Sequence, residues 1–476
     1  MKIKKNTIFI FPVVTGIFLM LTILSGCNLL YAATFYLWLL LFYYAYKNLE
    51  SRSLLFAFLI SVFIFLLDRE FLEQYFSYKV ENFTEQVNNH AYFLMLLSLM
   101  SIGVGYIFFS RKALKGVAKL EVTNSMINER IKTMSLLLYY ITICFAILSK
   151  VVTSRYVSQF GYSDYYLDYS ELLSGNIILY IISKIELMMP VALSAFMASM
   201  PSKKCFKFPA LLYLIYLAIS LGSGQRSTSM LGILFLLVYI LFRQGINPEE
   251  KWFKKSYIII GILMLPVLAI FFSWYSYWRF DSDMSNFNWY TGFFDFFYDQ
   301  GVTSNVIKRA YIYEDQIPND TLYTLEFMRS GLIAKLLGIP VYHGNTVEHA
   351  LYGGSYAHTL GYILLKDSYL RGRGVGTSYI AELYQDFGYI GVILGNLLYS
   401  YILVRVTNVF KTRKIFVLTL QFYMIAQILW APRGSFSGFL TVLFYPSTII
   451  SLLFIFGGAK ILSINGGKKG YKKRGI

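Results

Sequence analysis

Charged residues are scarce in this chain of 476 residues. Asp, Glu, Lys and Arg make up 14% of it, whereas soluble domains contain about 25%. Hydrophobic residues make up 57%, and many gather in runs long enough to cross the hydrocarbon core of a bilayer, about 30 Å thick. A soluble fold cannot bury so many helices that are apolar on all sides. The sequence therefore predicts an all-α, polytopic membrane protein.

Cysteine is also rare. The three cysteines, Cys27, Cys144 and Cys205, are odd in number and far apart, so the sequence predicts neither a disulfide framework nor a metal site. Residues 24–27 resemble the cleavage box of a lipoprotein. We interpret them instead as part of a first transmembrane helix, because a polytopic protein with a basic N-terminus rarely needs a cleaved signal.

Acidic residues are fewer than basic ones, 26 against 43, and the net charge is +17. The basic residues lie mostly in short loops between apolar runs and form no compact basic domain of the kind that binds nucleic acid. Their distribution is typical of topology signals. We therefore expect no nucleic-acid partner.

About twelve transmembrane helices are predicted. Lys and Arg concentrate at the termini and in every second loop, which by the positive-inside rule places both termini in the cytoplasm. The short outer loops hold only Arg69, Lys79, Lys150, Arg155, Arg226 and Arg433. The predicted spans are residues 7–26, 29–46, 53–67, 91–110, 134–149, 175–199, 208–222, 227–242, 256–275, 385–405, 415–431 and 437–458.

One outer segment is long. Residues 276–384 separate the ninth and tenth spans, and parts of them have apolar residues at helical spacing. A structured loop of this length is usually functional. No internal repeat is visible, which disfavours a transporter built from paired halves. We predict transmembrane helices in 1–275, a partly helical extracytoplasmic subdomain in 276–384, transmembrane helices in 385–458 and a basic cytoplasmic tail in 459–476.

Three outer segments each present arginine beside glycine or proline. They are residues 222–228 with Arg226, residues 369–378 with Arg371 and Arg373, and residues 431–436 with Arg433. The planar fork of arginine binds two oxygens of a phosphate, and glycines let backbone amides approach an anion. Together these segments predict an anion-binding site at one membrane interface. The alternative is that each arginine anchors a helix end there.

Two side chains are candidates for a general base. His358 is one of only four histidines, and an imidazole accepts a proton near neutral pH. The alternative is a polar side chain packed in the loop. Glu382 and Asp386 share one face of a helix at the mouth of an apolar segment. Carboxylates there need partners, so Glu382 is equally a structural partner of the nearby arginines.

Two further patterns are weaker. Residues 281–283, Asp-Ser-Asp, match the D-x-D by which many glycosyltransferases hold a metal and a nucleotide sugar, but nucleotide sugars are not expected on the outer side. Glu186 lies in the sixth span. An intramembrane carboxylate keeps an ion-coupled transporter as an alternative.

The chain resembles the O-antigen or oligosaccharide repeat-unit polymerases of the Wzy type, which are membrane glycosyltransferases of bacterial surface polysaccharide synthesis. The matching features are the turn around Arg226, the long outer loop, and residues 372–384 running into 387–391. The resemblance implies a polymerase at the outer face of the inner membrane that extends glycans carried on polyprenyl diphosphate, as in the O-antigen of lipopolysaccharide. It implies neither a nucleotide nor a metal cofactor.

The resemblance also implies roles for the candidate residues. Arg226, Arg371, Arg373 and Arg433 would hold the departing diphosphate, and His358 or Glu382 would be the base. Aromatic residues of the loop are candidates for stacking on sugars, although interface anchoring is the commoner role; they are Trp274, Trp278 and Trp289.

The implied partners are the lipid-linked oligosaccharide, the bilayer and, from the same pathway, a chain-length regulator and a flippase. One alternative is an O-antigen ligase, which shares the cations and the loop. Another is a lipid-linked oligosaccharide flippase or transporter, which would place its charges along a path through the helices. A third is an assembly protein without catalysis.

Overall fold

A computed structural model describes residues 6–114, 126–161, 165, 175–224, 226–254, 256–279, 287–408 and 414–463. Every regular element in these ranges is helical. The main helices of the bundle are α1 (Asn6–Ser25), α2 (Leu29–Tyr46), α3 (Ser53–Val62), η1 (Phe63–Leu67), α4 (Asp68–Phe76), α5 (Glu85–Leu114), α6 (Met126–Phe160), α9 (Ile177–Glu186), α10 (Met189–Ala198), α11 (Lys203–Leu221), α12 (Arg226–Ile246), α13 (Ser256–Arg279), α20 (Tyr379–Asn408), α21 (Ile415–Trp430), α23 (Pro446–Leu452) and η9 (Leu453–Gly457).

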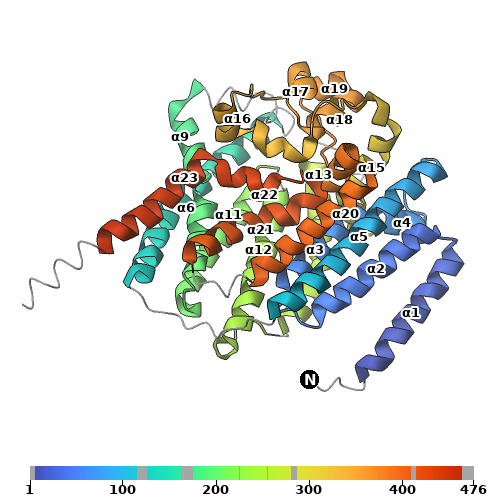
Figure 1. Cartoon of the computed structure of the whole chain (residues 1–476), viewed down its shortest axis with the longest axis horizontal. Helices are drawn as coiled ribbons and strands as arrows, with labels where there is room; N and C mark the ends of the chain where they lie inside the picture. The colour runs from blue at the N-terminus through green and yellow to red at the C-terminus, as the bar shows by residue number, and fades with distance from the viewer. Residues whose placement is uncertain are drawn as a thin grey trace, which may run out of the picture.

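Shorter helices lie between α13 and α20 and after α21. They are α14 (Gly292–Gln300), α15 (Thr303–Ile312), η5 (Tyr323–Arg329), α16 (Gly331–Leu337), α17 (Val347–Tyr352), α18 (Tyr356–Leu365), α19 (Asp367–Leu370), η7 (Ala431–Arg433), α22 (Gly438–Thr441) and η8 (Val442–Phe444). Figure 1 shows α16 to α19 gathered at one end of the bundle. We call this end the loop end.

The chain is a multi-pass membrane protein. Within the described ranges, ten helices are long and apolar enough to cross a membrane. The predicted spans 7–26 and 53–67 are not among the ten, although α1 covers the first, and α3, η1 and α4 cover the second. The count of twelve therefore stays a prediction. The ten are Leu29–Tyr46, Glu85–Arg111, Met126–Phe160, Ile177–Ala198, Lys203–Leu221, Arg226–Ile246, Ile259–Tyr277, Tyr379–Val406, Ile415–Arg433 and Pro446–Ser463.

Two boundaries differ from the prediction near the C-terminus. The segment predicted as one span from 437 is broken at Tyr445, which is extended (ψ 138°), and Pro446 begins α23. Proline is favoured in the first turn of a helix because its φ is already helical and its missing donor is not needed there. Helix α20 begins at Tyr379, inside the segment predicted as loop. Gly388 (φ 60°, ψ −153°) interrupts its helical geometry.

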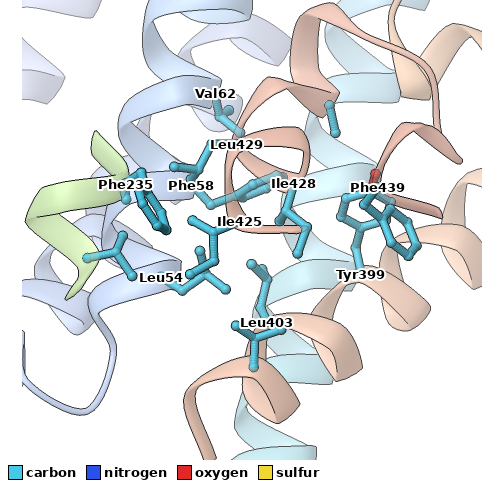
Figure 2. Close-up of a cluster of buried hydrophobic side chains, with 14 of the residues drawn as sticks. Leu54, Phe58, Val62, Phe235, Tyr399, Leu403, Ile425, Ile428, Leu429 and Phe439 are labelled. Atoms are coloured by element: carbon cyan, nitrogen blue, oxygen red, sulfur yellow. The ribbon is translucent and has the colours of Figure 1, made fainter. Parts of the chain in front are cut away.

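The middle of the bundle is densely packed. Figure 2 shows side chains of α3, α12, α20, α21 and α22 meeting there. Phe58, Tyr399 and Ile425 are wholly buried. Because lipid tails are as apolar as these side chains, transmembrane helices associate through close packing and interhelical hydrogen bonds.

Helices α5 and α20 illustrate such close packing. A Cβ atom on Gly105 would lie 2.4 Å from the Ser400 Oγ, so glycine is needed for this approach. Asn396 Nδ2 donates to Ser98 Oγ (3.1 Å). Small and polar residues are typical of helix contacts within membranes. The contact fixes α20, whose first turn follows the glycine-rich segment of the loop end.

The loop end is tied to the bundle by hydrogen bonds to α20. Asp386 accepts from the backbone nitrogens of Tyr323 (3.1 Å) and Thr324 (2.8 Å). Its carboxylate thereby satisfies donors at the start of η5, which have no partner within that short helix.

A buried ion pair ties α15 to α4. Lys308 Nζ lies 2.7 Å from Glu70 Oε1, and the side chains are 1% and 0% exposed. Tyr92 on α5 donates from its hydroxyl to Glu70 Oε2 (2.6 Å). A charge buried to this degree is tolerated only when it is paired and hydrogen-bonded. The pair therefore fixes the position of α15.

Candidate functional site

A cavity of about 1720 Å³ lies between the bundle and the loop end. Helices α10, α12 and α21 contribute to one side, and α15, α18 and residues 371–376 contribute to the other. Five arginines line it: Arg226, Arg309, Arg371, Arg373 and Arg433. The four arginines predicted from the sequence to bind an anion thus meet in one place, although they come from three segments far apart in the chain.

Backbone carbonyls orient two of these arginines. Arg226 begins α12, and its Nη1 donates to the oxygen of Phe272 on α13 (3.2 Å). Arg433 ends η7, and its Nη1 donates to the oxygen of Gln300 (3.0 Å). Burial raises the pKa of Asp299, and the nearby Arg226 guanidinium opposes that rise. Each arginine is therefore held by a neighbouring element rather than extended into solvent.

Arg371 and Arg373 are exposed and belong to the glycine-rich segment before α20. Gly372 (φ 84°) and Gly376 (φ 76°) have left-handed backbone conformations, which glycine adopts without steric cost. Asn345 Nδ2 donates to the Arg373 backbone oxygen (3.1 Å). This hydrogen bond holds the backbone of the segment beside the cavity. A glycine-rich loop that binds an anion needs its backbone held in this way.

Arg309 is a cation of the cavity that no sequence pattern indicates. It lies on α15, and the residue before this helix, Val302, lines the cavity on the same side as Asn305, Val306 and Arg309. Its guanidinium forms no hydrogen bond or ion pair with any residue that the structure describes. The adjacent Lys308 pairs with α4 instead. The spacing of these four residues is helical, but the sequence does not show which face of so short a helix borders a cavity.

Glu186 is the one carboxylate among the residues that line the cavity as described. Its Oε1 lies 2.9 Å from Lys150 Nζ and accepts from the Tyr216 hydroxyl (3.1 Å). Its charge is therefore already balanced by a lysine. The cavity as a whole is strongly cationic, which favours an anionic ligand.

His358 lines the same cavity from α18. Its Nδ1 lies 2.7 Å from the Tyr369 hydroxyl, and its ring stacks on His349 with 3.7 Å between ring centroids. The Tyr369 hydroxyl donates to Thr346 O (3.4 Å). Burial lowers the pKa of His358 to about 4, and His349 adds to the shift. The imidazole is therefore neutral near pH 7.

Glu382 is not among the residues that line the cavity. It is 0% exposed, its Oε1 accepts from Thr377 Oγ1 (2.8 Å), and its Oε2 accepts from the Phe436 backbone nitrogen (2.8 Å). None of the ion pairs found in the described ranges joins it to an arginine. The carboxylate instead connects the glycine-rich segment to the turn that follows Arg433.

The other predicted residues lie elsewhere. Trp274 and Trp289 do not line the cavity, and Trp289 is 63% exposed. The side chain of Trp278 and residues 281–283 lie outside the described residues. Among the residues that the structure describes, no group of three or more His, Cys, Asp or Glu residues could hold a metal ion.

Comparison with known proteins gives one match. No curated protein and no solved structure matches the chain. The family described as "O-antigen polysaccharide polymerase Wzy" matches residues 6–465, nearly the whole length. This match confirms the resemblance seen in the glycine-rich segment and the arginine turn, and it supports a role in polysaccharide polymerisation. The chain belongs to the O-antigen polysaccharide polymerase Wzy family.

Proposed function

We propose that this protein joins polyprenyl-diphosphate-linked oligosaccharide repeat units into a surface polysaccharide at the outer face of the bacterial inner membrane. Family membership supports the polymerase activity. The concentration of Lys and Arg in alternate loops supports cytoplasmic termini, and on that topology residues 276–384, with the arginine-lined cavity, face outward.

The observation that carries the proposal is the meeting of five arginines in one cavity. In the reaction, an acceptor hydroxyl oxygen bonds to the anomeric carbon of the growing chain, and the bond from that carbon to the diphosphate breaks. The hydroxyl proton passes to a base, and the bonding electrons leave with the diphosphate. Guanidinium groups around the departing oxygens stabilise this charge as it develops, and such stabilisation often contributes more to catalysis than any other effect.

His358 suits the role of base better than Glu382 does, because it lines the cavity. The Tyr369 hydroxyl donates to Thr346 O, so its own oxygen is able to accept from His358 Nδ1–H. This tautomer leaves a lone pair on Nε2. Glu382 is then a positioning residue, because its two oxygens hold Thr377 and Phe436.

The lowered pKa of His358 gives a pH prediction. Because the folded protein binds this proton only near pH 4, an imidazole base stays unprotonated as the pH falls through about 6.5, where a free histidine titrates. We expect the polymerisation rate between pH 5.5 and 8 to show no acid limb due to His358. The control is His343→Gln, which removes an exposed histidine. The assignment would be contradicted if wild type and this control both showed an acid limb near pH 6.5, and the residual activity of His358→Gln did not.

The proposed function is tested by reconstitution. Purified protein in vesicles, supplied with a polyprenyl-diphosphate-linked repeat unit, should produce a ladder of longer lipid-linked glycans. It should also release one polyprenyl diphosphate for each new bond. Transfer of finished glycan to a lipid core without a ladder indicates a ligase. Movement of the lipid-linked unit across the vesicle membrane without new bonds indicates a flippase.

A further inference from the structure

Two buried amides border the cavity next to the arginines. Gln300 ends α14 and is 5% exposed, and Asn305 lies on α15 and is 1% exposed. Both line the cavity. Gln300 Nε2 and Asn305 Oδ1 have no hydrogen-bond partner among the described residues. Leaving a buried donor or acceptor without a partner is costly, so these two atoms favour a water molecule or a ligand that can both donate and accept.

Asn305 is held so that its oxygen remains available. Its Nδ2 donates to Glu81 Oε2 (2.8 Å). This bond fixes the amide plane and leaves Oδ1 as an acceptor. The amide of Gln300 supplies a donor close by in sequence, because Gly301 and Val302 alone separate α14 from α15. A donor and an acceptor on one wall match a sugar hydroxyl, which both donates and accepts.

Trp430 adds an aromatic ring to the lining of the same cavity. Phe65 packs edge-on against it, with 5.3 Å between ring centroids and 79° between planes. Gly434 leaves room for it, since a Cβ there would lie 2.4 Å from Trp430 Cδ1. The indole is thus fixed. An aromatic surface with a few placed polar groups is the usual make-up of a small-molecule site.

We infer that Gln300, Asn305 and Trp430 form a subsite for a sugar ring, namely the sugar bonded directly to the diphosphate. The inference rests on the proposed function. Arg433 donates to the backbone oxygen of Gln300, and Arg309 lies one helical turn beyond Asn305 on the same face of α15. A ring held by these amides is therefore adjacent to cations that would hold its diphosphate.

The first test compares stability with activity. Gln300→Met keeps the length of the side chain and removes the amide that lacks a partner, so the melting temperature should stay the same or rise. Polymerisation should nevertheless fall about three- to tenfold, the effect of one lost hydrogen bond. The matched control is Gln421→Met on α21, another residue with a buried amide atom that has no partner, which does not line the cavity. It should keep both stability and activity.

The second test measures binding of two probes, polyprenyl diphosphate and polyprenyl diphosphate bearing a single sugar. The Gln300→Met variant should bind the sugar-free probe like wild type and the sugar-bearing probe about three- to tenfold more weakly. Equal weakening of both probes, or of neither, overturns the subsite, whereas binding of the sugar-free probe by wild type still supports the diphosphate site. Failure of wild type to bind either probe refutes the proposed function itself.

Discussion

Replacing Arg309 or Arg373 by Ala should lower the polymerisation rate at saturating substrate by about 10²–10³-fold, the effect of removing one hydrogen-bond donor from a developing anion. These two arginines make the cleanest test, because neither guanidinium has a partner among the described residues. Arg226 and Arg433 also bind backbone oxygens, so their loss would disturb the fold as well. The rate of polyprenyl diphosphate release from reconstituted protein is the measurement.

The matched control is Arg155→Ala, which removes an exposed arginine on α6 that does not line the arginine-lined cavity. It should keep the wild-type rate. Arg309→Lys retains the charge but not the planar fork, so it should recover only part of the loss. If Arg309→Ala and Arg373→Ala both produced glycans of normal length at the wild-type rate, the assignment of these arginines to the diphosphate would be wrong.

Breaking the buried pair between Lys308 and Glu70 should have the largest effect on stability. Lys308→Met or Glu70→Gln leaves one charge buried without its counter-ion, and such a loss costs roughly 3–5 kcal/mol. The double variant should be much less destabilised, because no uncompensated charge remains. The amide oxygen introduced by Glu70→Gln can still accept from the Tyr92 hydroxyl, but its amide nitrogen is a buried donor that has lost a partner, at a cost of about 1–3 kcal/mol. Thermal unfolding in detergent measures all three.

An exposed pair provides the comparison. Lys132 and Glu129 lie one turn apart on α6, 3.1 Å between charged atoms, and their side chains are 28% and 63% exposed. Removing either should leave the melting temperature unchanged, because solvent already screens such pairs. Equal effects at the two pairs would show that burial of Lys308 does not determine the stability of α15.

The sequence predicts the helices that face lipid best, because their length and composition follow from the bilayer itself. It predicts the ends of helices less well. Helix α20 begins at Tyr379, and the partners that Asp386 binds from its second turn, the Tyr323 and Thr324 nitrogens, lie some sixty residues earlier in the chain. The restart at Pro446, in contrast, had a local signal, since proline is favoured there.

For the site, the four predicted arginines stand beside glycine or proline in outer turns, and a charge in a turn is visible without knowing the packing. Arg309 and Gln300 were missed because they lie on short helices whose inner and outer faces are decided by tertiary contacts. Glu382 has a feature typical of catalytic residues, because it is a carboxylate at the mouth of an apolar helix. Its actual partner, the Phe436 nitrogen, lies 54 residues away in the chain.

A cavity in which arginines outnumber carboxylates attracts the lipid carrier after bond cleavage as strongly as before it. On the proposed function, the spent carrier keeps its diphosphate and so remains a good ligand for the site that it must vacate. Departure of a product of this kind commonly limits the turnover of an enzyme. Moderate salt, which screens attraction between charges, would then hasten each cycle, although it weakens the initial capture of substrate.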